Sequence, residues 1–319
     1  MAYPRIQSIV AVLVAAFLIS GLHGVQAAAA DDYVAKAREY VAGGEVKSAI
    51  IELKNALQSD PSHVEARLML GAQYMRSGEA AAAAKEFGRA RDLGAPSEAW
   101  LPGYARALLL QGKFETVLDE VQIDESLSPE LRAELLALRG NAHLASRQVE
   151  AAISDYDAAL QLQPGSPVAR LGKARILLGQ RQDQQALEQL DQLLLEHPDH
   201  LESLLARGDL QRRLKNLDAA ATDYAHAAEM APRSARAHIG LALVHIAQRD
   251  MPAAKKDLQV LNELAGELPA VSYLQALVSF QERDYGRASD ELQKLLRVAP
   301  GNLQAQLLYG IVSYARGEF

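Results

Sequence analysis

The sequence predicts an all-α protein, an α-solenoid of repeated helical hairpins over residues 28–319 that follows a signal peptide over residues 1–27. Composition, spacing and residue order each support this class. The chain of 319 residues is 49% hydrophobic but only 5% aromatic, which suits closely packed helices better than strands. Prolines recur at multiples of one period, and small and large residues keep fixed places within it.

The charge balance and the absence of cysteine exclude several functions. The chain has 33 basic and 40 acidic residues, a formal net charge of −7. A general nucleic-acid binder needs a basic face, so we expect no nucleic-acid partner. Because the chain has no cysteine, it has no disulfide, thiol nucleophile, thiolate zinc site or cysteine-linked lipid.

The first 27 residues have the organisation of a signal peptide. Arg5 supplies a positive charge, residues 9–19 form an apolar run, and Val25-Gln26-Ala27 matches the small-x-small motif that signal peptidase cleaves. The run is shorter than the about 20 residues that a membrane-spanning helix needs. We therefore expect an exported protein, periplasmic or associated with the envelope of a Gram-negative bacterium. The alternative is an uncleaved signal anchor, so that any membrane association is through this segment or through a partner.

The prolines define a period of 34 residues. Pro164, Pro198 and Pro232 are each 34 residues apart, Pro300 follows after two further periods, and Pro61 precedes Pro164 by three periods and one inserted residue. Because proline cannot continue a helix, each of them is expected to end one. If they occupy position 32 of the period, the repeats start near residues 30, 64, 98, 133, 167, 201, 235 and 269, with an incomplete repeat at 303.

In this register the small and large residues fall at fixed positions. Position 8 is glycine or alanine, position 20 is alanine in seven repeats, position 27 is alanine in four, and position 24 is bulky. Small residues let helix backbones approach, and large residues fill the space that remains. Position 20 holds Ala49, Ala83, Ala152, Ala186, Ala220, Ala254 and Ala288, and position 24 holds Leu53, Phe87, Tyr156, Leu190, Tyr224, Leu258 and Leu292.

This period and this residue order resemble the tetratricopeptide repeat family. The resemblance implies a right-handed superhelix in which each repeat pairs a helix A with a helix B. Glycines such as Gly44 suit the left-handed turn between the two helices, and Ser62 and Ser166 are available to cap following helices. The third repeat has a polar connector over residues 123–129, where we expect a bend or a flexible joint. Because the array stops inside a hairpin, we expect it to continue beyond Phe319.

No residue pattern indicates catalysis, a cofactor or a metal. The glycine-rich turn over residues 43–48 lacks the preceding strand and the glycine that a phosphate loop requires. His238 and His245 lie seven residues apart on one helix face, but at packing positions, and His197 and His200 flank a proline between repeats. We therefore predict a protein that is not an enzyme and holds no metal or cofactor.

Recognition is the predicted activity. In tetratricopeptide superhelices the inner wall is formed by helix A, around positions 2, 5, 9 and 12, and we expect a protein or peptide segment to bind there. The wall of repeats 7 to 9 is apolar, with Ile239, Leu243, Ile246, Tyr273, Leu277, Phe280, Leu307, Ile311 and Tyr314, whereas earlier repeats contribute Arg38, Arg106, Asn141, Arg175, Asp209 and Arg212. The alternative is that these residues pack between neighbouring repeats, or against the missing part of the ninth hairpin. Only Asn141 matches the lysine and asparagine set with which some family members hold peptide carboxylates, so that clamp is not expected.

Residues 31–121 are similar to the tetratricopeptide proteins of the exosortase/PEP-CTERM system, in the segments YVAKAREY at 33–40, AIIELKNALQ at 49–58 and RALLLQGKF at 106–114. The resemblance implies a role in a bacterial machinery that couples exopolysaccharide production to the sorting of surface proteins. Its members are described as lipoproteins, and this chain lacks the cysteine of a lipid anchor. The leading hypothesis is a non-enzymatic scaffold of the cell envelope. The alternative is the helical arm of a larger polysaccharide-export channel or envelope enzyme, whose functional domain would lie beyond residue 319.

Overall fold

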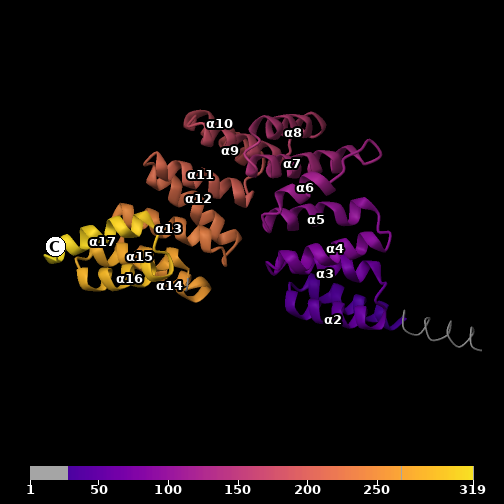
Figure 1. The fold of residues 1–319 in the computed structure, drawn as a ribbon, viewed down its shortest axis with the longest axis horizontal. Coiled ribbons are helices and arrows are strands. Elements are labelled where there is room, and N and C mark those ends of the chain that lie inside the picture. Colours follow the sequence, from indigo (N-terminus) through magenta and orange to yellow (C-terminus); the bar gives the residue numbers. More distant parts are fainter. Residues whose placement is uncertain (1–27, 267, 319) are drawn as a thin grey trace, which may run out of the picture. The chain divides into compact units, whose positions relative to one another are not determined.

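The computed structural model describes residues 28–266 and 268–318, and every regular element within these ranges is an α-helix (Figure 1). The predicted helical class is therefore confirmed. The predicted signal peptide lies outside the described residues. No helix in the described ranges combines the length and the apolar composition that a membrane span requires.

The helices follow one another as A–B pairs in the predicted register. The pairs are 28–42 with α2 (Val46–Ser59), α3 (Val64–Arg76) with α4 (Ala80–Asp92), α5 (Ser97–Leu110) with α6 (Phe114–Glu120), α7 (Pro129–Ala145) with α8 (Val149–Leu162), α9 (Pro167–Gly179) with α10 (Asp183–Glu196), α11 (Leu201–Arg213) with α12 (Leu217–Met230), α13 (Ala235–Gln248) with α14 (Met251–Ala265) and α15 (Pro269–Gln281) with α16 (Tyr285–Val298), and α17 (Leu303–Arg316) follows. Each of α2, α8, α10, α12 and α16 ends two residues before its position-32 proline. The chain divides into two compact units inside α9, the first ending at Gly172 and the second beginning at Lys173.

The alanines of position 20 are the centre of each hairpin. All seven are 0% exposed, and the bulky residues of position 24 are at most 6% exposed. The predicted register of small and large residues is therefore confirmed. At 0% exposure a larger side chain at position 20 has no space, since the facing helix already occupies it.

Glycine at position 6 is a feature that the residue code did not include. A Cβ atom on Gly240 would lie 2.4 Å from the ring of Tyr224, and one on Gly172 would lie 2.2 Å from the ring of Tyr156. Gly208, at position 8, faces the Tyr224 ring from the other side, where a Cβ atom would lie 2.9 Å away. An aromatic ring at position 24 thus occupies the space of two missing side chains, one on its own helix A and one on the next.

The turn from helix A to helix B has a left-handed residue at position 15. The glycines Gly44, Gly78, Gly112 and Gly317 have φ between 71° and 81°, as the left-handed turn predicted for the first three repeats requires. In repeats 4 to 8 the same position holds Arg147, Arg181, Lys215, Arg249 and Arg283, with φ between 61° and 67°. The geometry of the hairpin therefore imposes the left-handed conformation at position 15, even on residues that have a Cβ atom.

The irregular third repeat keeps a continuous core. Its helix B, α6, has only 7 residues, and residues 121–128 connect it to α7. Val121 and Leu127 in this connector are buried in the same apolar cluster as Leu108 and Leu131. The predicted bend or joint at this connector stays a prediction.

One predicted helix cap is wrong. The side chain of His63, not that of Ser62, caps α3, because His63 Nδ1 accepts a hydrogen bond from the N–H of Ala66 at 3.2 Å. Ser62 Oγ instead donates to Oδ1 of Asp60 at 2.6 Å. Ser166 Oγ accepts from the N–H of Ala169 at 3.5 Å, as expected for a cap.

Candidate functional site: the A-helix face

The predicted binding wall consists of positions 2, 5, 9 and 12 of the A helices, here called the A-helix face. In the first unit its arginines bind carboxylates of the following repeat. Arg38 Nη2 lies 2.5 Å from Glu65 Oε1, and Arg106 Nη2 lies 2.7 Å from Glu134 Oε1. Each pair joins position 9 of one repeat to position 2 of the next. Because the side chains are substantially exposed, each pair contributes less than about 1 kcal/mol to stability.

In the second unit the same pairing continues and then reverses its polarity. Arg175 lies 3.4 Å from Glu202, and Glu202 lies 3.1 Å from Arg236. Arg236 also binds Asp209 at 2.9 Å, so that in this pair the acid is at position 9 and the arginine at position 2. The charged part of the face is therefore largely neutralised by its own residues.

Two residues of the face anchor buried tyrosines. The hydroxyl of Tyr156 donates to Asn141 Oδ1 at 2.9 Å, and the hydroxyl of Tyr224 donates to Asp209 Oδ1 at 2.6 Å. Burial, and next the hydrogen bond to Asp209, raise the pKa of Tyr224 above its ordinary value. The hydroxyl is therefore neutral in the physiological range and serves as a donor. Asn141, predicted as a binding residue, has this structural role.

Arg212 is the arginine of the face without an ion pair among the described residues. It lies against the Tyr224 hydroxyl, where its charge favours the phenolate and so lowers the pKa of that group, against the larger effect of burial. Its Nε is buried and has no hydrogen-bond partner within the described part of the chain. Arg212 therefore contacts the buried tyrosine rather than a carboxylate.

The apolar part of the wall divides into packed and exposed residues. Ile246 is 6% exposed and belongs to a core cluster of repeats 7 and 8, against which Ile239 and Leu243 pack, partly buried. Tyr273, Leu277 and Phe280 pack, also partly buried, against the cluster of repeats 8 and 9. By contrast, Leu307, Ile311 and Tyr314 on α17 are 69%, 45% and 73% exposed. Among the wall residues that the structure describes, the exposed apolar surface is therefore concentrated on α17.

Sequence reasoning missed one member of this surface. Leu303, at position 1 of the last repeat, is 77% exposed at the start of α17. It precedes Leu307 and Ile311 by four and eight residues, which places the three side chains on one helix face. This spacing was visible in the sequence, but position 1 is not among the usual wall positions.

Three histidines singled out in the sequence, His200, His238 and His245, contact nearby polar groups. His245 Nδ1 lies 2.7 Å from Asp257 Oδ2, while His238 Nε2 lies 3.1 Å from the backbone oxygen of Pro232. His200 Nδ1 lies 2.7 Å from Ser203 Oγ, and burial lowers the pKa of this histidine. No group of three or more histidine or acidic residues in the described ranges is arranged to hold a metal ion.

Comparisons with known proteins agree with this architecture. Two family models described as tetratricopeptide repeat match the chain, one at residues 143–208 and the other at residues 34–98, 114–167, 205–261 and 273–319. No curated protein matches it. Among solved structures, a chain of the APC/C hetero-tetramer Cut9–Hcn1 is similar, with a TM-score of 0.66 and 15% identity over 85% of this chain. The present chain covers 53% of that chain.

Two further structures are similar to parts of the chain. A tetratricopeptide repeat protein from Parabacteroides merdae has a TM-score of 0.45 and 15% identity, covering 89% of this chain and 98% of its own. YrrB, described as having an unusual peptide-binding site, has a TM-score of 0.45 and 16% identity, covering 60% of this chain and 95% of its own. The family-model matches span most of the chain, which therefore belongs to the tetratricopeptide repeat family, whose members bind peptide or protein partners and are generally non-enzymatic scaffolds.

Proposed function

We propose that this protein is a non-enzymatic scaffold that binds a protein segment on the A-helix face of its second unit. The observation that carries the proposal is the exposed apolar strip on α17, formed by Leu303, Leu307, Ile311 and Tyr314, with exposures of 45% to 77%. A run of large apolar side chains on one helix face is typical of a partner surface. A partner with apolar side chains at helical or extended spacing fits this strip.

The charged part of the face has a different role in the proposal. Its carboxylates and arginines already pair with one another, so a partner gains little by replacing these contacts. Arg212 is the exception, since within the described residues it contacts the Tyr224 hydroxyl and has no carboxylate partner. We infer that apolar contacts on α17 supply most of the affinity and that the charges upstream select the partner.

Crosslinking tests this assignment. A photoreactive residue at Ile311 is expected to capture a discrete partner in cells. The matched control is the same residue at Leu195 on α10, which is 86% exposed and lies outside the A-helix face. Equal capture at both positions, or capture at Ile311 of nothing but a second copy of the chain, would contradict the proposal.

We propose further that the scaffold works in the bacterial cell envelope, in exosortase/PEP-CTERM-linked protein sorting and exopolysaccharide production. The support is the signal-peptide pattern of residues 1–27 and the similarity of residues 31–121 to proteins of that system. Fusion of residues 1–30 to a phosphatase that is active only after export should give active enzyme. Deletion of the gene should reduce exopolysaccharide and leave the sorted surface proteins unprocessed. Normal processing and polysaccharide in the deletion strain would refute the pathway while leaving the binding scaffold intact.

A further inference from the structure

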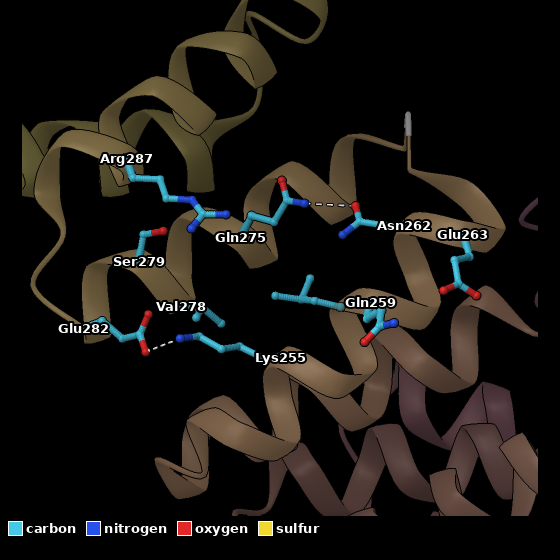
Figure 2. Close-up of a pocket in the computed structure, with 10 residues that line it drawn as sticks. Lys255, Gln259, Asn262, Glu263, Gln275, Val278, Ser279, Glu282 and Arg287 are labelled. Atoms are coloured by element: carbon cyan, nitrogen blue, oxygen red, sulfur yellow. Dashed lines mark hydrogen bonds and ion pairs between the residues drawn. The ribbon is translucent and has the colours of Figure 1, made fainter.

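A groove of about 510 Å³ lies between α14, α15 and α16, away from the A-helix face (Figure 2). Its floor is apolar, formed by Leu258 and Val278, which are 6% and 4% exposed. Its walls are polar. A groove of this size accommodates a ligand of several residues, since small-ligand pockets usually measure about 300–1,000 Å³.

The groove exists because a small side chain occupies packing position 11 of α15. At other junctions a long or aromatic residue at position 7 or 11 of helix A covers the preceding helix B. The ring of Tyr74 lies beneath Lys54, Arg207 binds Asp191 at 2.7 Å, and the Tyr309 hydroxyl accepts from Gln293 at 3.0 Å. At the α14–α15 junction the corresponding residues are Gln275 and Ser279. Ser279 is 4% exposed and too small to fill the space above it.

Side-chain amides face each other across this groove. Gln275 Nε2 on α15 donates to Asn262 Oδ1 on α14 at 3.0 Å, as Figure 2 shows. This bond leaves the Gln275 oxygen as an acceptor and the Asn262 nitrogen as a donor. A peptide backbone presents the same alternation of N–H and C=O groups, so an extended segment can bond to both.

The charges in the groove leave one cation available. Lys255 Nζ lies 2.5 Å from Glu282 Oε1 and is neutralised by it. Arg287 extends from α16 toward Gln275 (Figure 2), and its guanidinium has no ion-pair partner among the described residues. A planar guanidinium binds a carboxylate through two parallel hydrogen bonds, which favours an acidic side chain at this end.

The residues of α14 that line the groove run from Lys255 to Glu263. Glu263 lines it and also lines an adjoining hollow of about 380 Å³ formed with Leu264, Ala265, Gly266 and Leu268. At this end the Glu263 carboxylate and the carboxyl end of the helix both favour positive charge. An elongated ligand with an acid at one end and a base at the other fits better than a compact one.

We propose that this groove is a second binding site, for an extended peptide segment that places an acidic side chain on Arg287 and an aliphatic side chain on the Leu258–Val278 floor. The site shares no residue with the A-helix face. A negative result for this site would therefore leave the scaffold function proposed above unaffected.

The test titrates the full chain with the blocked peptide acetyl-Asp-Ala-Leu-Ala-Lys-amide and follows the side-chain amide signals of Gln259, Asn262 and Gln275 by nuclear magnetic resonance. Wild-type protein should show saturable shifts of these signals. Arg287→Gln should weaken binding by about tenfold or more, since a hydrogen bond to a charged group is lost. The matched control is Arg297→Gln, an exposed arginine on the same helix that does not line the groove.

A filling variant tests the cavity itself. Ser279→His introduces the residue that the preceding repeat has at the same position, His245, and should abolish peptide binding. Ser313→His, at position 11 of the last repeat, should leave binding unchanged. The proposal is overturned if the peptide shifts no amide signal, if Arg287→Gln binds as wild type does, or if sodium acetate alone shifts the same signals with equal affinity. Variants at Ile311 should not affect this titration.

Discussion

Repeats 6 (201–234) and 7 (235–268) share one backbone plan but fill their interiors differently. In repeat 6 the ring of Tyr224 occupies position 24, with glycine at position 8 of its own helix A and Gly240 at position 6 of the next. In repeat 7 the corresponding three residues are Leu258, Ala242 and Leu274. The space between three helices is thus filled either by one ring and two glycines or by three aliphatic side chains. The comparison teaches that these three positions form one packing unit.

The acid at position 23 differs in the same way. Asp223 in repeat 6 accepts two hydrogen bonds from Arg207, at 2.9 and 2.6 Å, whereas Asp257 in repeat 7 lies 2.7 Å from His245. The hydrogen bond to Asp223 raises the pKa of Arg207, while burial raises the pKa of Asp257. Burial therefore has a larger effect on the acid of repeat 7, whereas Asp223 is held by two hydrogen bonds from a guanidinium.

The largest expected effect comes from breaking the glycine pair. Gly240→Ala should destabilise the protein by about 3 kcal/mol, because the new Cβ atom has no space beside the buried ring of Tyr224. Gly310→Ala is the matched control, a helical glycine whose Cβ would meet nothing within 4 Å. It should stabilise by up to about 1 kcal/mol through helix propensity. Urea unfolding measures both, and equal effects would refute the packing unit.

Overpacking the centre of a hairpin should destabilise the protein less than the Gly240→Ala substitution does. Ala220→Leu in repeat 6 should destabilise by about 2 kcal/mol, because Ala220 is 0% exposed against the facing helix. The thermal midpoint should fall accordingly. An unchanged midpoint would contradict the assigned register of small positions.

Substitutions that give repeat 6 the packing residues of repeat 7 test whether positions 8 and 24 are energetically coupled. In wild type, Gly208→Ala should destabilise, since its Cβ atom would lie 2.9 Å from the Tyr224 ring. In a Tyr224→Leu background the same change should instead stabilise by about 1 kcal/mol, because alanine then fills the vacated space. A double-mutant cycle by urea unfolding measures the difference. Additive effects would show that the positions act independently.

The smallest expected effect is a change with pH in repeat 7. The pKa of Asp257 is raised above its ordinary value of 3.8, so the folded state favours the protonated acid. The resulting stabilisation is complete below about pH 4 and is lost as pH rises through the folded pKa. Asp257→Asn removes that loss. The free energy of unfolding of this variant should therefore increase relative to that of wild type as the pH rises above the ordinary aspartate pKa of 3.8. A constant difference would contradict the assignment.

Much of the architecture was predictable, and the binding face less so. Proline spacing predicted where five helices end, and the alanines at position 20 predicted the hairpin centres, because both effects are local to one repeat. The exposure of the wall residues was not predictable in the same way. Ile239 and Leu307 occupy the same wall position of their repeats, yet the first is partly buried and the second is 69% exposed. That difference depends on which neighbours pack against each helix.

The sequence by itself determined the period, the helical class and the identity of the small and large positions, since these follow from helix geometry and side-chain volume. The tertiary structure decided which charges pair and which apolar residues stay exposed. Arg38 and Arg106 look like free binding groups in the sequence, but stacking brings each to a carboxylate of the following repeat. The groove above Ser279 likewise exists only because three helices surround a side chain too small to fill it. Contacts between repeats join residues about 27 positions apart, and a one-dimensional pattern does not specify their distances.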